Sequence, residues 1–341
     1  MVNSRQRCMP GTVLVAPDKF KGTFTARQVS DALARGLAAG GQPAELCPVA
    51  DGGEGTLAAL AGPLGLELQT TQASDPLGRR IDATFGLGRG GVAVVEMAAA
   101  SGLALLDLQQ LDALAASTYG TGELIAAAVA AGARAVYVSV GGSATTDGGE
   151  GAVRALREHG GLGDARITLL CDVTIPFELA APVFGPQKGA SAHQVQLLSR
   201  RLDRLAGSLP RDPRGVPMTG AAGGLAGGLW AHFGARLVAG APFVLDAVGF
   251  DTRMRAAAAV VTGEGSLDRQ SLAGKVVSEV ATRARQAGVP CHAVVGRNRL
   301  GCFDLRILDL QLVEEATTLA EIEAAGTRVA REFAAQRARG R

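Results

Sequence analysis

The sequence predicts an α/β protein built on parallel β-sheet, and three observations support this class. Short apolar runs, such as 12–16 and 135–140, alternate with glycine-rich loops and then with helical patterns. Several of these runs are closely followed by an acidic residue, as the run at 12–16 is followed by Asp18. This strand–loop–helix style stops near residue 70 and returns near residue 257, which indicates two domains.

Composition limits the possible partners. A chain of 341 residues with 47% hydrophobic residues can bury one large core or two medium ones. The formal net charge of +2 gives no field that would attract nucleic acid or an anionic membrane, and no apolar run reaches membrane-spanning length. The N-terminal apolar run is too short for a signal peptide. We therefore expect a cytoplasmic protein that binds neither nucleic acid nor membrane.

The cysteines predict the same compartment, because their number is odd and none has CxxC spacing. We expect them to be small core residues in a reducing environment, without disulfides or a zinc site. They are Cys8, Cys47, Cys171, Cys291 and Cys302.

The first strand–loop–helix unit begins with the apolar run at 12–16. The loop that follows, PDKFKGT, carries Asp18, Lys19 and Lys21. A capping-box spacing that begins at Thr25 predicts the start of a helix. Because ligands bind outside the carboxyl ends of parallel strands, we expect this loop to belong to a functional site.

The second unit repeats the pattern, and then the style changes. A strand at 44–50 ends in DGGEGT, which begins at Asp51, and a short helix follows at 57–61. Alternating residues over 66–88 flank a DPLG turn and predict an antiparallel hairpin, before a further strand at 92–96.

The centre of the chain is a glycine and hydroxyl loop between a strand and a helix. Thr121 is a plausible N-cap for the helix at 123–131, and the strand at 135–140 leads into the loop GGSATTDGG. Bare backbone amides in such a loop suit an anion, while the alternative is a plain turn with Thr146 or Asp147 as N-cap. The candidate ligand-binding residues here are Gly141, Gly142, Ser143 and Asp147.

Two further glycine-rich segments follow. A strand at 167–172 ends in Asp172, and the loop VFGPQKGA carries Lys188 before an amphipathic helix at 192–207. The segment TGAAGGLAGG, residues 219–228, is predicted to be either a flexible loop or a helix that packs closely through its glycines.

The C-terminal part returns to the first style. A strand at 257–262 ends in a loop with Glu264 and Asp268, and Lys275 stands at the start of a helix. A last helix is predicted at 318–339, where its basic end suits the helix dipole.

The chemistry follows from which charged residues occupy these loops. Only four of the 34 basic residues are lysines, and each lies in a glycine-flanked loop. Carboxylates, lysines and glycine loops together are what Mg²⁺-assisted phosphoryl transfer requires. The P-loop motif is absent, and the chain has no serine–histidine elbow motif that would indicate a hydrolase. The lysines are Lys19, Lys21, Lys188 and Lys275, and the loop acids are Asp18, Asp51, Glu54, Asp147, Asp172, Glu264 and Asp268.

A series of motifs resembles the type I glycerate kinase family. These motifs include APDKFKGT, PVADGGEGT, STYGTGELI, GGSATTDGG, VFGPQKGA and VTGEGSLDRQSLAGK, and they occur in family order over most of the chain. The resemblance implies phosphorylation of D-glycerate by ATP with Mg²⁺, usually at the 2-hydroxyl, within glyoxylate and glycerate metabolism. It implies small-molecule partners, namely glycerate and the nucleotide.

The resemblance also implies the domain arrangement. A Rossmann-like parallel-sheet domain would be formed by both chain ends, residues 1–71 and 256–341. An inserted α/β domain would span 72–255, with the active site in the cleft between the two.

We assign roles on this basis as hypotheses. Asp18, Lys19 and Lys21 would face the acceptor and the transferred phosphoryl group, and Lys188 is placed with these catalytic residues. Asp51 and Asp172 are candidates for general base or Mg²⁺ ligand. The remaining candidates for substrate or phosphate binding are Gly141, Gly142, Ser143, Asp147, Glu264, Asp268 and Lys275.

Three departures from the family pattern leave alternatives open. The stretch 152–170 is short, Ile175 stands where an asparagine is typical, and Thr146 replaces another asparagine. The alternatives are a kinase for a related hydroxy acid, a kinase that phosphorylates the 3-hydroxyl, or a non-catalytic two-lobed sensor of a hydroxy acid.

Overall fold

The computed structural model describes residues 11–269 and 271–339. The chain divides into two compact units, of which unit 1 comprises Met1–Asp51 and Val244–Arg341, and unit 2 comprises Gly52–Phe243. Cys8 lies outside the described residues.

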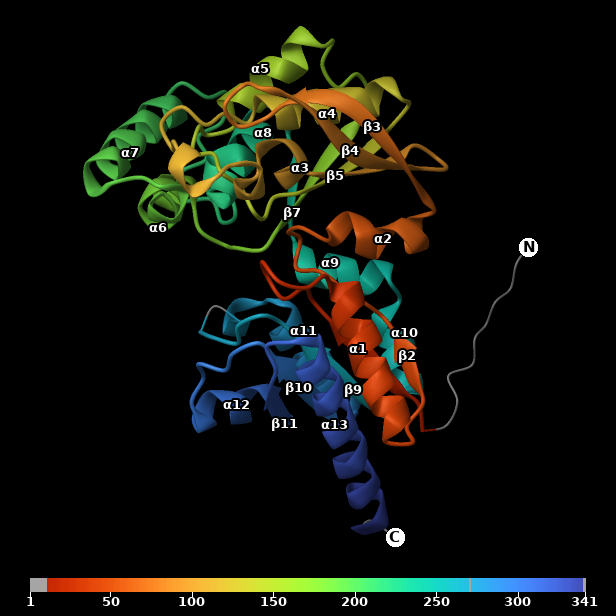
Figure 1. The fold of residues 1–341 in the computed structure, drawn as a ribbon. Helices are drawn as coiled ribbons and strands as arrows, with labels where there is room; N and C mark the ends of the chain where they lie inside the picture. Colours follow the sequence, from red (N-terminus) through yellow and green to blue (C-terminus); the bar gives the residue numbers. More distant parts are fainter. Residues whose placement is uncertain (1–10, 270, 340–341) are drawn as a thin grey trace. The chain divides into compact units, whose positions relative to one another are not determined.

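Unit 1 is built on a five-stranded sheet in which all the pairings are parallel. The strand order is β11-β10-β9-β1-β2, so the first strands of the chain lie beside strands from its last hundred residues (Figure 1). This confirms the predicted parallel α/β class. The strands are β1 (Val13–Pro17), β2 (Ala44–Leu46), β9 (Ala259–Gly263), β10 (Cys291–Val295) and β11 (Leu310–Glu315).

The helices of unit 1 cover its sheet. Helices α1 and α13 lie side by side and share a core with Val13 and Val15 of β1 (Figure 1). Leu14 points to the opposite face, because side chains alternate along a strand, and α11 contacts β1, β9 and β10. The helices are α1 (Ala26–Ala39), α10 (Phe250–Ala256), α11 (Val276–Ala287), α12 (Cys302–Leu308) and α13 (Leu319–Arg339), with a 3₁₀ turn η6 (Ser271–Ala273).

Unit 2 contains a six-stranded mixed sheet of order β3-β4-β5-β6-β7-β8. Strands β3 and β4 form the predicted antiparallel hairpin around the turn at Asp75, and β5 to β8 are parallel. The strands are β3 (Leu66–Ser74), β4 (Arg80–Gly88), β5 (Val92–Glu96), β6 (Ala135–Ser139), β7 (Arg166–Cys171) and β8 (Arg236–Ala239).

Most helices of unit 2 pack on this sheet around an extensive apolar core, and two pack against each other around a separate cluster that includes Phe177 and Leu198 (Figure 1). They are α2 (Thr56–Leu64), α3 (Ala98–Ser101), α4 (Tyr119–Ala130), α5 (Glu150–Glu158), α6 (Ala180–Phe184), α7 (Ala192–Ala206) and α8 (Leu225–Phe233), and α9 (Gly240–Ala247) crosses the boundary between units. The 3₁₀ turns are η1 (Leu103–Leu105), η2 (Leu108–Gln110), η3 (Phe177–Leu179), η4 (Pro186–Lys188) and η5 (Ala221–Gly224).

The start of α4 differs from its prediction. The helix begins at Tyr119 after Thr118, and Thr121 lies inside it. Its two early glycines are in the helix because neighbours leave no room for a side chain. A Cβ at Gly120 would lie 1.8 Å from the carbonyl oxygen of Ser74, and one at Gly122 would lie 2.5 Å from that of Ala152.

The boundaries between the units also differ from the expected ones at 71/72 and 255/256. The structure divides the chain after residues 51 and 243. Helix α2 contacts β3, β4 and β5, and the amide of Leu57 donates to Glu96 at 2.8 Å, so these residues belong to the second unit. Phe243 stacks against Tyr137 of β6, which keeps it in the same unit.

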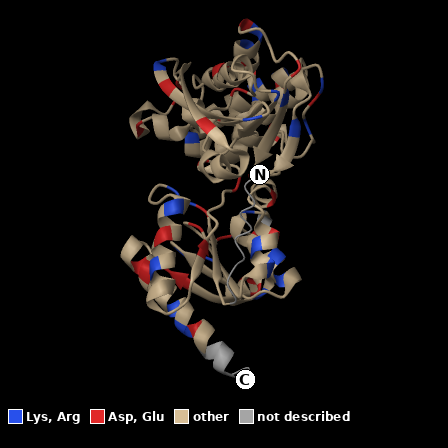
Figure 2. Ribbon diagram, turned by 90° about the vertical axis from the view of Figure 1, so that its right-hand side faces the viewer, with Lys and Arg blue, Asp and Glu red and all other residues tan. Residues whose placement is uncertain are grey.

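The charge distribution, the cysteines and the apolarity of the helices were compared with the expectations from the sequence. Both signs of charge occur on the helices of each unit (Figure 2). Cys47, Cys171 and Cys291 are buried thiols, but Cys302 is exposed at the start of α12, so the prediction of a core position is wrong for that residue. Among the described residues, no helix combines the length and apolarity needed to cross a bilayer.

Candidate active site

Three acidic residues meet at the carboxyl edge of the unit 1 sheet. Asp18 follows β1 and Glu264 follows β9, and these strands are parallel neighbours, so the amide of Asp18 donates to the carbonyl of Gly263 at 2.8 Å. After β2 the chain continues along β1, where the amide of Val49 donates to the carbonyl of Pro17 at 3.1 Å. This path brings Asp51 to the same edge.

Burial makes this acidic group electrostatically unusual. Burial, together with Asp51, raises the pKa of Asp18 well above its usual value, against the lowering effect of Lys19. Burial also raises the pKa of Glu264 to about 7, although Ser271 and Lys275 lower it. Among the described residues, Oε1 of Glu264 has no hydrogen-bond partner. The group therefore concentrates carboxylates where water does not stabilise them.

The other predicted residues of unit 1 surround this acidic group. The positive charge of Lys19 lowers the pKa of Asp18, and Lys275 occupies the N-cap position of α11. The amide of Asp268 donates to the hydroxyl of Ser271 at 3.1 Å, and its carboxylate adds to the field that raises the pKa of Glu264. The side chain of Lys21 is exposed and lines a cavity at the same edge. Unit 1 therefore brings together six of its seven predicted site residues, while Lys21 lies at the same sheet edge and lines a cavity that the other six do not line.

In unit 2, the predicted loop Gly141–Gly149 follows β6 and packs tightly against the segment after Asp51. A Cβ at Gly141 would lie 2.6 Å from Cα of Gly53 and 3.6 Å from Oδ2 of Asp172. Gly142 has a φ of +79°, and a Cβ there would lie 2.7 Å from Oε1 of Glu54. The structure thus gathers Glu54, Asp172 and the start of the loop at the carboxyl ends of β6 and β7.

Asp147 holds this loop to the start of α4. Its carboxylate accepts hydrogen bonds from the amide and the hydroxyl of Thr118, both at 2.8 Å, and from the amides of Gly149 and Gly151. The residue is 3% exposed. Each of these bonds is within unit 2, so the contacts of Asp147 are those of a structural anchor, and the N-cap of α5 is Gly149.

Lys188 also holds the Gly141–Gly149 loop, through a hydrogen bond to its backbone. It is buried in the turn before α7, and its Nζ donates to the carbonyl of Thr145 at 2.5 Å. Burial lowers the pKa of its ammonium group to about 7, while Asp147 and Asp172 act in the opposite direction. The side chain is therefore placed to fix the loop backbone rather than to reach into solvent.

The glycine cluster at 219–228 explains how the loop is packed. Part of it forms α8, which confirms the prediction of a helix that packs through glycines for that part. A Cβ at Gly223, where φ is +66°, would lie 2.0 Å from the carbonyl oxygen of Thr145. The hydroxyls of Thr145 and Thr146 are buried without a hydrogen-bond partner among the described residues.

Sequence reasoning missed Arg297 and Arg299, which line the same cavity as Lys21. The cavity has a volume of about 330 Å³. The two arginines follow Gly296, the residue directly after β10, so a search for charged residues after each strand would have found them. They went unnoticed because arginine is abundant throughout this sequence.

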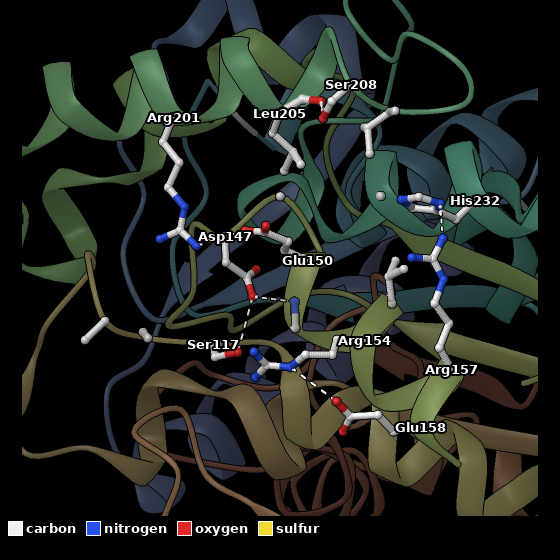
Figure 3. A pocket seen from close by; sticks show the side chains of 17 residues that line it. Ser117, Asp147, Glu150, Arg154, Arg157, Glu158, Arg201, Leu205, Ser208 and His232 are labelled. Carbon is white, nitrogen blue, oxygen red and sulfur yellow. Dashed lines mark hydrogen bonds and ion pairs between the residues drawn. The ribbon is translucent and has the colours of Figure 1, made fainter. Parts of the chain in front are cut away.

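A larger cavity, of about 680 Å³, lies among α5, α7 and α8 in unit 2 (Figure 3). Its charges are balanced within the cavity, as Arg201 pairs with Glu150 at 3.0 Å and Arg154 approaches Glu158 at 4.0 Å. The third arginine of the cavity, Arg157, contacts the ring of His232. The remaining carboxylate belongs to Asp147, which is held by the hydrogen bonds described above. Its size alone therefore gives no reason to prefer it as a site for a polyanion.

Unit 1 is thus an open parallel α/β sheet with acids and lysines at its carboxyl edge, the position at which such sheets bind ligands. The sequence model described as "Glycerate kinase family" matches residues 13–161 and 157–339. These two segments meet inside the stretch that the sequence indicated as short. The chain belongs to the glycerate kinase family.

Individual relatives agree with this assignment. A glycerate kinase of Halalkalibacterium halodurans is 37% identical over 323 residues, which cover 84% of this chain and 85% of the relative. A glycerate 2-kinase of Escherichia coli strain K12 is 36% identical over 323 residues, with 83% and 84% covered. A crystal structure described as glycerate kinase 2 of Salmonella typhimurium LT2 has a TM-score of 0.78 at 31% identity, and covers 96% of this chain and 99% of its own.

Proposed function

We propose that this chain transfers the γ-phosphoryl group of ATP to D-glycerate and forms 2-phosphoglycerate. Family membership supports the kinase class, and one relative is named a glycerate 2-kinase. The observation that carries the chemistry is the group formed by the buried Asp18 and Glu264 and the half-buried Asp51, beside lysines at the sheet edge. The reaction belongs to glyoxylate and glycerate metabolism in the cytoplasm, where ATP is available.

Asp18 is the general base in this proposal. Its raised pKa makes it a better proton acceptor near neutral pH than an ordinary aspartate. It takes the proton from the attacking hydroxyl of glycerate, whose oxygen then bonds to the γ-phosphorus. The bond from phosphorus to the β,γ-bridging oxygen breaks, and ADP leaves. Lys19 and Lys275 offset the negative charge of the acidic group, and Lys21 binds phosphate oxygens.

The residues of unit 1 fit Mg²⁺. Asp51 offers hard carboxylate oxygens, and Oε1 of Glu264, which has no hydrogen-bond partner among the described residues, lies in the same group. No described set of three or more such side chains forms a ready metal site. Mg²⁺ in kinases is usually held by one or two carboxylates together with substrate phosphates, so that finding is compatible with the proposal. When bound, Mg²⁺ neutralises charge on the phosphate oxygens.

The loop of unit 2 binds the acceptor in this proposal. Gly141, Gly142 and Ser143 lie at the carboxyl end of β6, the edge of a parallel sheet outside which ligands bind. Asp172 accepts a hydrogen bond from the glycerate hydroxyl that is not phosphorylated. Lys188 keeps the loop in place through the carbonyl of Thr145.

The test is a reaction of the purified protein with ATP, Mg²⁺ and D-glycerate, with L-glycerate as the control. We expect ADP to form only with the D-acid, and ³¹P NMR against authentic standards to identify 2-phosphoglycerate. A product with the resonance of 3-phosphoglycerate overturns the assigned position. ATP consumption that does not respond to glycerate overturns the assigned acceptor.

The variant K21M tests the role of the lysine loop. Lys21 is exposed, so its replacement leaves the fold intact and the melting temperature within about 2 °C. We expect kcat/KM to fall by at least about 100-fold, because a charge that stabilises the transferred phosphoryl group is lost. Wild-type turnover in K21M removes this lysine from the mechanism.

A further inference from the structure

The cavity beside Lys21 lies at the point where the unit 1 sheet reverses its order. From β1 the chain moves to β2 on one side, whereas from β9 it moves to β10 and β11 on the other. In doubly wound sheets, ligands bind in the crevice outside the carboxyl ends of the strands at this reversal. The cavity is lined there by Phe20, Lys21 and Thr23 after β1, Gly265 and Ser266 after β9, Gly296, Arg297 and Arg299 after β10, and Thr317 after β11.

The charge of the cavity has one sign. Lys21, Arg297 and Arg299 are cationic, and none of the other lining residues is acidic. Within the described chain, neither arginine has an ion pair or a side-chain hydrogen bond. Other arginines of unit 1 are paired, as Arg253 is with Glu45 at 2.5 Å and Arg35 with Glu323 at 2.8 Å. The two arginines of the cavity therefore keep their donors available for an anion.

Backbone contacts hold these cations in place. The amide of Leu267 donates to the carbonyl of Arg297 at 2.9 Å, and the amide of Arg299 donates to the carbonyl of Leu267 at 2.8 Å. The two loops touch directly, since a Cβ at Gly296 would lie 2.4 Å from the carbonyl oxygen of Gly265. The backbone of Arg297, Arg299 and Ser266 is therefore held in one wall of the cavity.

We propose that this cavity is the subsite for the polyphosphate chain of the nucleotide, with Lys21, Arg297 and Arg299 bound to phosphate oxygens. The inference rests on the proposed kinase function. Guanidinium groups pair with phosphate in a bidentate manner, and the ammonium group of Lys21 adds a third cation. The lining offers cations and hydroxyls but only one aromatic ring, the buried Phe20, so the cavity suits the phosphates rather than the base.

The direct test measures binding of inorganic tripolyphosphate to the full chain by calorimetry, without Mg²⁺. We expect the double variant R297Q/R299Q to bind at least about 10-fold more weakly than the wild type, with a shallower dependence on salt. The matched control is R306Q, which removes an exposed arginine of the same unit outside the cavity, and we expect less than a twofold change. Equal affinity in the wild type and the double variant, or no binding to the wild type, overturns the subsite.

A second measurement separates the subsite from the proposed function. In the glycerate assay, the double variant should raise the KM for ATP at least 10-fold and leave the KM for glycerate within twofold. If the wild type phosphorylates glycerate and the double variant has an unchanged KM for ATP, the subsite fails while the function stands. If tripolyphosphate binding depends on the arginines but no glycerate is phosphorylated, the function fails while the subsite stands.

Discussion

The carboxyl group of Glu264 links the stability of the protein to pH. Burial raises its pKa from 4.5 to about 7, so between these values the folded chain binds a proton that the unfolded chain does not. Its contribution to stability is therefore present at low pH and is lost as pH rises toward 7. The reason is desolvation of the charged form, which lies beside Asp51 and Asp268.

The variant E264Q should remove this dependence. Glutamine does not titrate, so the free energy of unfolding of E264Q relative to the wild type should increase by roughly 3 kcal/mol from pH 4.5 to pH 8. Urea unfolding of both proteins at several pH values, without Mg²⁺, measures the difference. A difference that stays constant with pH contradicts the assigned pKa.

Lys188 makes a prediction about substrate affinity. K188M keeps the length of the side chain but loses the bond to the carbonyl of Thr145, so we expect the free energy of unfolding to change by less than about 2 kcal/mol. Without that bond the Gly141–Gly149 loop loses its support, and the KM for glycerate should rise more than 10-fold with a smaller change in kcat. Steady-state kinetics decide this, and an unchanged KM shows that the loop does not need the lysine.

Most of the candidate site could be located from the sequence, because an apolar run followed by glycines and charged residues marks the end of a strand. Asp18, Asp51 and Glu264 each follow an apolar run, and parallel pairing brings such positions to one edge. What sequence could not show is which polar side chains are already satisfied. Asp147 and Lys188 have the same loop chemistry as the others, but their hydrogen bonds within unit 2 were determined only by packing.

Helix α8 shows how glycines set the distance between elements. A Cβ at Gly227 would lie 2.4 Å from Cδ2 of Phe177, because this helix packs directly on that ring. We predict that G227A lowers the free energy of unfolding by about 1–3 kcal/mol, the usual range for overpacking a core. Chemical denaturation measures the change.

The matched control for this prediction is G207A at the end of α7. Its φ of −67° suits alanine, and the nearest atom to a Cβ there lies 3.7 Å away. This variant should be neutral, or more stable by up to about 1 kcal/mol, because alanine has less freedom in the unfolded chain. If both variants lose the same stability, the packing explanation for Gly227 is wrong.

Elements with local signals were predictable from the sequence, whereas two of the four edge strands were not. A capping box or a tight turn depends on only a few neighbouring residues. The structure contains the predicted capping box at Thr25 and the predicted turn at Asp75, and a further capping box at Ser191. Strands β8 and β11 were missed. Both lie at sheet edges with partly exposed residues, so neither has the continuous apolar run of a central strand.

At the scale of the whole molecule, the two units differ in how the chain supplies them. Unit 2 is one continuous segment with its own core, whereas unit 1 needs both ends of the chain. We predict that the fragment 52–243 folds alone and unfolds cooperatively, as followed by circular dichroism on heating. The fragment 1–51 should stay unfolded, because β1 and β2 lack β9, β10 and β11. A non-cooperative melt of 52–243 contradicts its autonomy.

The pairing of β1 with β9 has a consequence during synthesis. Thr262 of β9 donates a hydrogen bond to the carbonyl of Ala16 of β1, across 246 residues of chain. A ribosome that adds about 5–20 residues per second needs roughly 10–50 s to make that stretch. Throughout this interval the apolar strand VLVAP of the nascent chain lacks its central neighbour. We therefore expect newly made molecules to be exposed to aggregation during this interval, and to need chaperones more than a protein whose neighbouring strands are consecutive.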